Sequence, residues 1–375
     1  MSSVQRVLIL SIKAGAGHLR AAQALEAAFH EEHPGVEVRH VEALQLTSAA
    51  FRKTFTGVYE RLVKHLPSVW GLIYENLERK PVDSRVKKLT TLFDRANSRK
   101  IVKAAEEFAP DRIICTHYFP AEVLAAQRRK GKLATPLYVV LTDYDIHIMW
   151  IQEGADGYFV ATDEMAYALK AKGVGEASVS VTGIPIMPVF AKTYPDRAAM
   201  RAKLGLRAEA STVLVAAGGF GMGEVDRTVA LLADGAEDVQ LLAIAGSNEK
   251  LRQALQAVAA SRPGRIVPYG FVDNMHELMA ASDFAVTKPG GLTSSECLAM
   301  GLPMVIINPI PGQEERNSDY LLENGVALRA NSAAHLVFKV QKLLADASLR
   351  VRMSESALRI ARPRAAYEIA DCVLT

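Results

Sequence analysis

Short apolar runs alternate along the chain with stretches whose apolar positions recur at helical spacing. The runs 7–11, 111–115 and 136–141 are predicted to be strands of a buried sheet. After the first run a helix is predicted, because these residues recur at the spacing of one helix face: Ala21, Ala22, Leu25, Ala28 and Phe29. This order of elements predicts α/β domains with parallel sheets.

The pattern continues to the carboxyl terminus. Further strands are predicted at 157–162, 179–185, 212–217, 241–246, 265–269, 283–287 and 304–307. Prolines at 185, 188 and 195 interrupt the pattern, so a domain boundary is predicted near 188–198. The predicted fold class is α/β, with two doubly wound parallel-sheet domains at 1–190 and 191–355 and a final helix at 356–375. Arg362-Pro363-Arg364 is expected to kink that helix.

Composition narrows the class of protein. Half of the 375 residues are apolar, but no run approaches the ~18 residues of a membrane span. The first residues have too short an apolar core for a signal peptide, so a cytoplasmic location is expected. Cys115, Cys297 and Cys372 lack the spacing of a disulfide framework or a thiolate metal site, and are expected to be reduced core residues.

Positive charge is concentrated in one segment. Residues 52–103 carry thirteen Lys or Arg against five Asp or Glu, a local charge of +8 in a chain of net charge +3. Residues 51–66 also place aromatic and leucine side chains on one stripe, which suits the headgroup layer of an anionic membrane. The alternative is an ordinary helix packed on its domain with a solvated basic side. Nucleic acid is not expected as a partner, because no nucleic-acid motif accompanies the segment.

A glycine turn begins the most informative stretch of the chain. Pro289 and the pair Gly290-Gly291 follow a predicted strand, and the spacing of Thr293 and Glu296 predicts a capping box for the next helix. The free N–H groups of such a helix end suit a diphosphate. Alternatively, Glu296 only closes the capping box. Gln313, Glu314 and Asn317 follow the strand at 304–307, either as ligand-binding groups or as solvated loop residues.

A second glycine loop precedes the first helix. Its residues 15–18 are Gly-Ala-Gly-His, and Arg20 stands where the third glycine of a dinucleotide fingerprint would fall, which excludes an NAD site of that kind. His18 is expected either to cap the helix or to move a proton with a pKa near neutrality.

Two further loops lie at predicted strand ends. Residues 142–147 follow a strand and include Asp143, and residues 218–223 contain four glycines that allow a diphosphate to approach the backbone or merely permit tight packing. Asp143 and Asp145 alone supply too few oxygen ligands for a hard cation, so no metal site is predicted.

The stretch 288–317 resembles the donor-nucleotide signature of a family of lipid glycosyltransferases. The family includes monogalactosyldiacylglycerol synthases, bacterial processive diacylglycerol glucosyltransferases and the peptidoglycan enzyme that adds N-acetylglucosamine to a lipid-linked precursor. The matching residues are Lys-Pro-Gly-Gly-Leu-Thr-Ser-Ser-Glu at 288–296, Gly-Leu-Pro at 301–303, Pro-Gly-Gln-Glu at 311–314, and Asn317. The resemblance implies a GT-B fold of two Rossmann-like domains facing a cleft, with a final helix that crosses back to the first domain.

The resemblance also implies roles for individual residues. His18 and Asp143 would be catalytic, with the identity of the base left open. Acceptor contacts would come from His147 and Trp150, and sugar contacts from Gln313, Glu314 and Asn317. Nucleotide or diphosphate contacts would come from Gly17, Gly219, Gly221, Phe271, Val272, Gly291, Leu292, Thr293 and Glu296, and no metal or other cofactor is expected.

We therefore expect an inverting hexosyltransferase that uses UDP-glucose or UDP-galactose and acts on diacylglycerol or a related glycolipid. It would lie peripherally on the inner face of the cell membrane, bound through residues 51–103. A UDP-N-acetylglucosamine 2-epimerase-like enzyme on the same fold is one alternative. A nucleotide-binding or membrane-binding regulator without catalysis is another.

Overall fold

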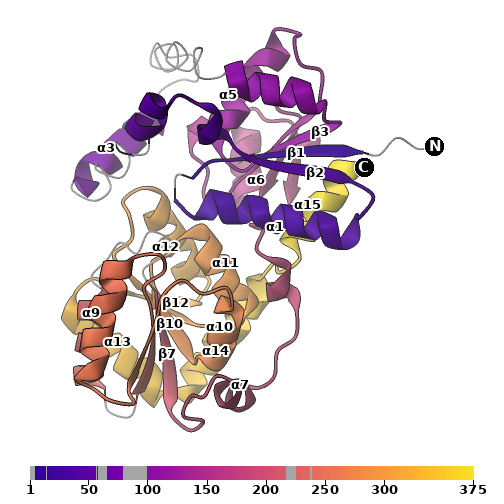
Figure 1. Cartoon of the computed structure of the whole chain (residues 1–375). Coiled ribbons are helices and arrows are strands. Elements are labelled where there is room, and N and C mark those ends of the chain that lie inside the picture. Colours follow the sequence, from indigo (N-terminus) through magenta and orange to yellow (C-terminus); the bar gives the residue numbers. More distant parts are fainter. Residues whose placement is uncertain are drawn as a thin grey trace. The chain divides into compact units, whose positions relative to one another are not determined.

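The computed structural model describes residues 5–13, 15–55, 57, 66–78, 99–216, 225–236 and 239–375. Backbone contacts group the chain into two compact units. Unit 1 contains Met1–Pro188, Pro311–Gln313 and Pro363–Thr375, and unit 2 contains Val189–Ile310 and Glu314–Arg362. The sequence predicts the two divisions after residues 190 and 355. Figure 1 labels the helices and strands of both units.

Unit 1 is built on a six-stranded sheet in the order β2-β1-β3-β4-β5-β6. All neighbouring strands are parallel. The strands are β1 Arg6–Ser11, β2 Glu37–Glu42, β3 Arg112–Cys115, β4 Leu137–Val140, β5 Gly157–Val160 and β6 Val179–Val181. Because the chain runs from β1 outward to β2 and then returns to the other side of β1, the strand order reverses between β1 and β3. The sheet is therefore doubly wound, which is the class of sheet that the sequence predicts.

The helices of unit 1 follow from the apolar spacing. Helix α1, Gly17–Glu32, buries all five residues predicted for its inner face, including Leu25 and Phe29. The other helical segments are α3 Pro67–Glu78, α5 Tyr118–Arg129, α6 Asp163–Ala171 and α15 Ala365–Leu374, with short 3-10 turns at Ala43–Leu46, Ile148–Trp150 (η2) and Glu176–Ser178. Helix α15 packs on α1, where Tyr367 donates a hydrogen bond of 2.5 Å to Glu31 (Figure 1).

Unit 2 has a second six-stranded sheet, in the order β12-β11-β10-β7-β8-β9. Its strands are also all parallel. They are β7 Ser211–Ala216, β8 Val239–Ile244, β9 Ile266–Tyr269, β10 Phe284–Thr287, β11 Met304–Ile307 and β12 Ala327–Ala330. Here the order reverses between β7 and β10. Each sheet therefore has one switch point, where ligands of such folds bind beyond the carboxyl ends of the strands.

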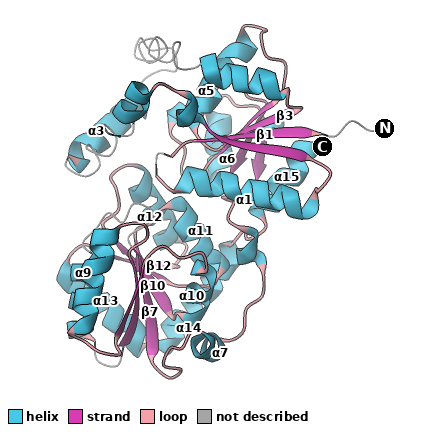
Figure 2. Cartoon of the chain, viewed as in Figure 1, coloured by secondary structure: helices cyan, strands magenta, loops and turns pink. Residues whose placement is uncertain are grey.

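Helices cover the unit 2 sheet, as Figure 2 shows in cyan around the magenta strands. Alternate strand residues such as Val213, Val215 and Val286 pack in one apolar cluster with side chains of α8, α9 and α13. The helical segments are Pro188–Ala191 (3-10), α7 Arg197–Lys203, α8 Val225–Gly235, α9 Glu249–Ala260, α10 Met275–Ala281, α11 Gly291–Ala299, α12 Gln313–Glu323, α13 Ala333–Ala345 and α14 Ala347–Ile360. Continuous apolar strands explain why the sequence predicted this sheet well.

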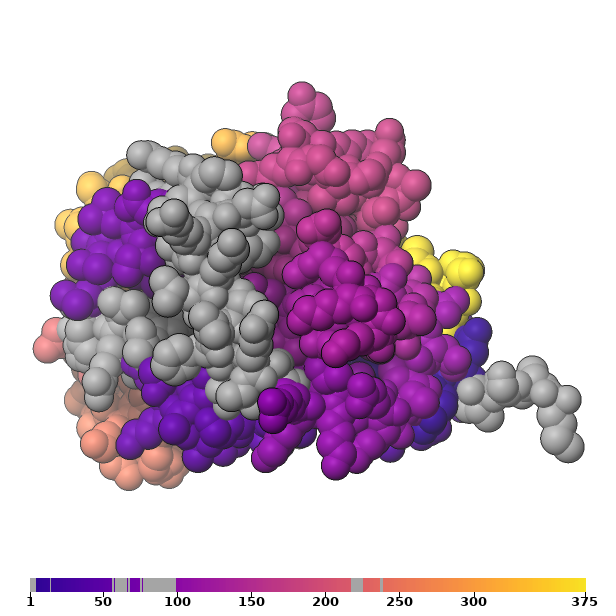
Figure 3. Space-filling model, turned by 90° about the horizontal axis from the view of Figure 1, so that it is seen from above, coloured from indigo at the N-terminus to yellow at the C-terminus, as the bar shows by residue number. Residues whose placement is uncertain are grey.

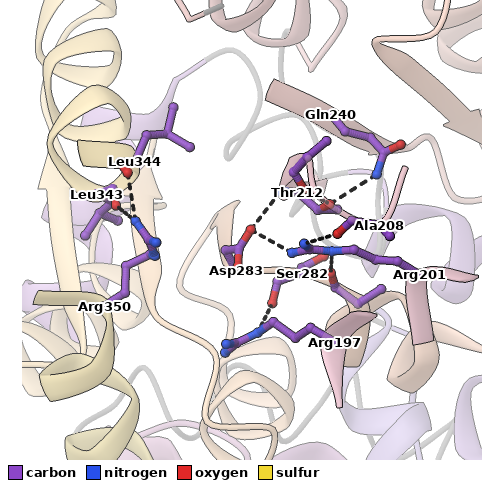
Figure 4. A network of polar contacts seen from close by, with 12 residues as sticks. Arg197, Arg201, Ala208, Thr212, Gln240, Ser282, Asp283, Leu343, Leu344 and Arg350 are labelled. Carbon is purple, nitrogen blue, oxygen red and sulfur yellow. Dashed lines mark hydrogen bonds and ion pairs between the residues drawn. The ribbon is translucent and has the colours of Figure 1, made fainter. Parts of the chain in front are cut away.

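A buried polar network fastens α7 to the amino ends of β7 and β10 (Figure 4). Arg201 is 7% exposed and pairs with Asp283 at 2.8 Å. The Arg201 guanidinium also donates to the carbonyls of Ala281 and Ala208. The same Asp283 oxygen accepts from the backbone N–H of Thr212 at 2.8 Å. This network holds the rim of the sheet opposite to the strand ends where ligands are expected.

Three expectations about local structure are wrong. The helix ends before Pro363 and a separate helix begins after it, giving α14 and α15, whereas a kink within one helix was predicted. The sequence predicts a loop at 116–120 after the strand at 111–115, but α5 already begins at Tyr118. Pro120 therefore lies in the first helical turn, where it needs no N–H partner. Cys372 is exposed, whereas burial raises the pKa of the Cys115 and Cys297 thiols as expected for core residues.

Candidate active site

His18 lies at the switch point of unit 1. It is the second residue of α1, and Ala16 occupies the N-cap position, so the alternative in which His18 caps the helix is wrong. Its ring Nδ1 lies 2.9 Å from the hydroxyl oxygen of Thr142, which follows β4. Its backbone carbonyl accepts a 2.8 Å hydrogen bond from the hydroxyl of Thr116, which follows β3. Side chains from two strand ends therefore hold this histidine in place.

A second histidine, His117, packs against the first. The two rings meet edge to face, with centroids 4.6 Å apart. His117 is 4% exposed and is the N-cap of α5, where its Nδ1 accepts a hydrogen bond of 3.0 Å from the backbone N–H of Phe119. The ring of Trp150 lies 5.9 Å from each histidine. These contacts bring the predicted residues His18 and Trp150 together.

Both histidines are neutral at physiological pH. Burial lowers the pKa of His18 to about 4, against a smaller opposing effect of a hydrogen bond with the Thr116 backbone. Burial also lowers the pKa of His117 well below its ordinary value, and a charge on His18 would lower it further. The expectation of a His18 pKa near neutrality is therefore wrong. A neutral imidazole can still donate or accept one hydrogen bond at each nitrogen.

The loop after β4 supplies the other predicted residues of unit 1. Asp143 follows Thr142 directly and is half-buried. His147 is 2% exposed and caps the short turn η2: its Nδ1 accepts from Met149 N at 3.3 Å, and its Nε2 donates to the carbonyl of Tyr74 at 3.0 Å. The Tyr74 and His147 rings lie 4.2 Å apart. Because both nitrogens of His147 bond to protein, the geometry favours a role in anchoring α3.

In unit 2, the glycine turn lies at the switch point, after β10. Helix α11 begins at Gly291 with Gly290 as its N-cap and without a side-chain cap. The predicted capping box is therefore wrong: Thr293 lies inside the first turn, and Glu296 is not needed to close a box. Both side chains are half-buried and lie three residues apart on one helix face, whereas Leu292 is 8% exposed. The first N–H groups of α11 remain suited to a phosphate.

Helix α12 is tied to this turn. The Asn317 amide has no exposed surface and donates to the carbonyl of Pro289 at 3.0 Å. Glu314 accepts from the backbone N–H of Ile310 at 2.7 Å. Its other carboxylate oxygen lies 3.9 Å from where a Cβ on Gly290 would stand. Gln313 is the first residue of α12. This arrangement gives Asn317 a part in holding the turn, and sets Glu314 beside it.

The remaining predicted residues fall at other strand ends or outside the described ranges. By residue type alone Phe271 would be predicted to lie in the core, but it follows β9 and is 72% exposed, so that prediction is wrong. Val272 is half-buried. Gly17 is the first residue of α1. Gly219 and Gly221 lie outside the described residues, as does much of the basic segment 51–103. Within the described ranges, no group of three or more His, Cys, Asp or Glu side chains is placed to hold a metal ion.

Sequence reasoning missed Thr116, His117 and Thr142. The available signal was their position: each directly follows a strand at or beside the switch point of the first sheet. That signal can be used only when the order of the strands in the sheet is known.

Comparisons with known proteins agree with this fold. Residues 18–186 match the family of monogalactosyldiacylglycerol (MGDG) synthases, and residues 196–359 match the glycosyl transferases group 1. A processive diacylglycerol β-glucosyltransferase of Bacillus cereus is 30% identical over 371 residues, covering 98% of this chain and 93% of the relative.

Two solved structures share the fold. MurG of Acinetobacter baumannii has a TM-score of 0.66 at 15% identity, with 99% of both chains covered. A UDP-GlcNAc 2-epimerase from Neisseria meningitidis, bound to UDP-GlcNAc, has a TM-score of 0.62 at 13% identity, also with 99% of both chains covered. At these identities the likeness concerns the fold alone.

Two parallel doubly wound sheets and the two sequence families define a glycosyltransferase of the GT-B fold that transfers a hexose from a UDP-sugar. Within that class, the chain belongs to the family of processive diacylglycerol β-glucosyltransferases and monogalactosyldiacylglycerol synthases.

Proposed function

We propose that the enzyme moves glucose from UDP-glucose to diacylglycerol, or to a glycolipid made from it, with inversion at the anomeric carbon. Its sequence relatives are named as diacylglycerol glucosyltransferases, which favours glucose over galactose. The observation that carries the proposal is the switch point of unit 2. There the N-terminus of α11 offers free backbone N–H groups, and Thr293 and Glu296 lie in the same helix. The chain also belongs to this family.

The proposed chemistry is a direct displacement. The acceptor hydroxyl loses its proton to His18 or Asp143 and attacks the anomeric carbon as the bond to UDP breaks. The N–H groups at the start of α11, together with the loop 218–223, stabilise the negative charge of the departing UDP. Glu296 binds the ribose hydroxyls, and Gln313 and Glu314 bind the sugar. Fixed backbone dipoles take the place of a metal ion in this scheme.

The direct test is release of UDP from UDP-glucose and UDP-galactose by the full chain, with diacylglycerol in anionic mixed micelles and EDTA present. We expect turnover with UDP-glucose that requires the lipid and is unaffected by EDTA. Dependence on a divalent ion would overturn the metal-free scheme. Formation of an epimer from UDP-N-acetylglucosamine without a lipid would replace the proposal with the epimerase. Binding of UDP-sugar without turnover of any kind would favour the non-catalytic regulator.

We also propose that α3 contacts the membrane that holds the acceptor. No helix in the described residues is long and apolar enough to cross a bilayer. Helix α3 does, however, expose apolar side chains: Val69, Leu72 and Ile73 are 41%, 61% and 37% exposed, and Leu66 just before the helix is 52% exposed. Helix α3 carries no Lys or Arg of its own. Much of 51–66, for which a packed helix with a basic solvated side is the alternative, lies outside the described residues.

The position of α3 supports this role. It lies at the surface of the molecule (Figure 3), and its Tyr74 contacts His147 in the loop after β4. The flanking sequence supplies the positive charge expected to face anionic headgroups, since residues 52–103 carry a net charge of +8. Such contacts would place the enzyme peripherally on the cytoplasmic face of the cell membrane.

Leu72→Ser is expected to weaken binding to phosphatidylglycerol vesicles about tenfold, because one leucine side chain is no longer buried in the lipid. Phe338→Ser is the matched control, since Phe338 is 64% exposed on α13 of unit 2. Cosedimentation of the full chain with vesicles measures both. Equal binding by Leu72→Ser and the unchanged protein would remove α3 from the membrane contact.

A further inference from the structure

Thr142 contacts His18 through a hydrogen bond to one nitrogen of its ring. The Thr142 hydroxyl is 2.9 Å from His18 Nδ1, and the residue is 3% exposed. Within the described part of the chain, this is the only hydrogen bond of the Thr142 side chain. The hydroxyl of Thr116, by comparison, is bonded to the backbone carbonyl of His18. The orientation of the imidazole therefore depends on Thr142.

The direction of this hydrogen bond follows from burial. If the Thr142 hydroxyl only accepted a proton from Nδ1, its own proton would have no acceptor among the residues that the structure describes, in a place with almost no access to water. Leaving a buried donor unpaired is costly. Donation from the hydroxyl to an unprotonated Nδ1 avoids this cost. The proton of the neutral His18 ring is then on Nε2.

The groups that face His18 are compatible with this state. His117 packs edge to face against it, and the Nδ1 of His117 already accepts from Phe119 N, so the proton of a neutral His117 is also on Nε2. Asp143, the residue after Thr142, is the nearest acidic residue along the same loop. Among the described residues, no carboxylate makes a hydrogen bond with His18, so this part of the chain gives the imidazole no acidic partner of the kind that supports a histidine base.

We propose that Thr142 is a positioning residue, whose hydroxyl donates to Nδ1 and holds His18 as a neutral imidazole with its proton on Nε2. In this tautomer His18 offers an N–H donor to an oxygen of the substrates. It does not offer a free lone pair to a substrate proton, so Asp143 is left as the base of the proposed scheme. The importance of this tautomer for turnover rests on the proposed function, but the tautomer itself is a property of the protein alone.

The test measures the tautomer directly. In the full chain with 15N-labelled histidine, long-range 1H–15N spectra distinguish protonated from unprotonated ring nitrogens, and His18→Gln identifies the His18 signals. We expect an unprotonated Nδ1 and a protonated Nε2 at pH 7. A protonated Nδ1, or a fast average of both tautomers, would overturn the proposal even if the enzyme transfers glucose. This measurement needs no activity, so failure of the proposed function leaves it decisive.

Three variants separate positioning from folding. Thr142→Val has nearly the same shape without the hydroxyl, and is expected to mix the His18 tautomers and lower kcat about tenfold with little change in KM. Thr142→Ser restores the hydroxyl and should restore both. Thr47→Val is the matched control, because Thr47 is 4% exposed and its hydroxyl donates to Leu44 O at 2.7 Å, away from the site. A purely structural role would be indicated by unchanged His18 signals in Thr142→Val.

Discussion

His18→Ala is expected to lower kcat/KM at least about 100-fold while the fold and most of the affinity for UDP are retained. Removal of a positioned hydrogen-bond donor has an effect of this size. The side chain is only half-buried at the start of α1, and Ala16 and Gly17 begin the helix without it. UDP release under saturating lipid, with circular dichroism as the check on folding, measures this effect.

Glu296→Ala is the matched comparison, with the opposite profile. Glu296 lies in unit 2 on the exposed side of α11, and is expected to bind the ribose. Its loss should therefore weaken UDP binding, as measured by calorimetry, as well as slow transfer. Full activity in either variant would remove the corresponding residue from the site. Equal loss of UDP binding in both would show that His18 acts on the donor.

The pKa of His18 predicts the pH dependence of this activity. Burial lowers that pKa to about 4 from an ordinary value of 6.5, so the folded protein binds fewer protons at His18 than the unfolded chain does between these values. His18 stays neutral down to about pH 4, and its contribution to folding stability is complete above pH 6.5 and is lost as the pH falls toward 4. Activity in unchanged protein should therefore show no step near pH 6.5 that disappears in His18→Ala.

The fold was predictable because its signals are local. Each buried strand of a parallel sheet is a short continuous apolar run. The buried face of α1 is predicted by the spacing of its apolar residues alone. The start of α11 was predicted at the wrong residue, and this error also has a local cause. Thr293 and Glu296 have capping-box spacing, but Gly290, which adopts extended backbone angles, is the N-cap and lies three residues before Thr293. A glycine N-cap leaves no side-chain signature in the sequence.

The hydrogen bonds that hold His18 could not be predicted from the sequence, for a different reason. Thr116 and Thr142 lie 98 and 124 residues from His18, and only the crossover that sets β3 between β1 and β4 brings them together. The pKa of His18 depends on the same contacts, since burial is its main cause. Residue types and spacing identified His18, therefore, whereas its protonation state required the strand order.

Asp283→Ala is expected to cost about 3–5 kcal/mol of folding free energy, the other large effect that the structure predicts. Asp283 neutralises the buried guanidinium of Arg201 and accepts from Thr212 N, both at 2.8 Å (Figure 4). Its removal leaves a buried positive charge and a buried N–H group without their partner. Urea denaturation of the full chain, followed by circular dichroism, measures the change.

Asp234→Ala is the control for this ion pair. Asp234 pairs with Arg262 at 2.7 Å, but its side chain is 65% exposed, so water replaces the lost contacts and a cost below about 1 kcal/mol is expected. Arg201→Met together with Asp283→Leu should be less destabilising than Asp283→Ala, because the double change removes the buried charge along with its partner. If Asp283→Ala cost no more than Asp234→Ala, the buried network would not be what fastens α7 to the sheet. The network lies at the amino ends of β7 and β10, away from the strand ends where ligands bind. Asp283→Ala is therefore expected to leave the affinity for UDP unchanged while the protein remains folded.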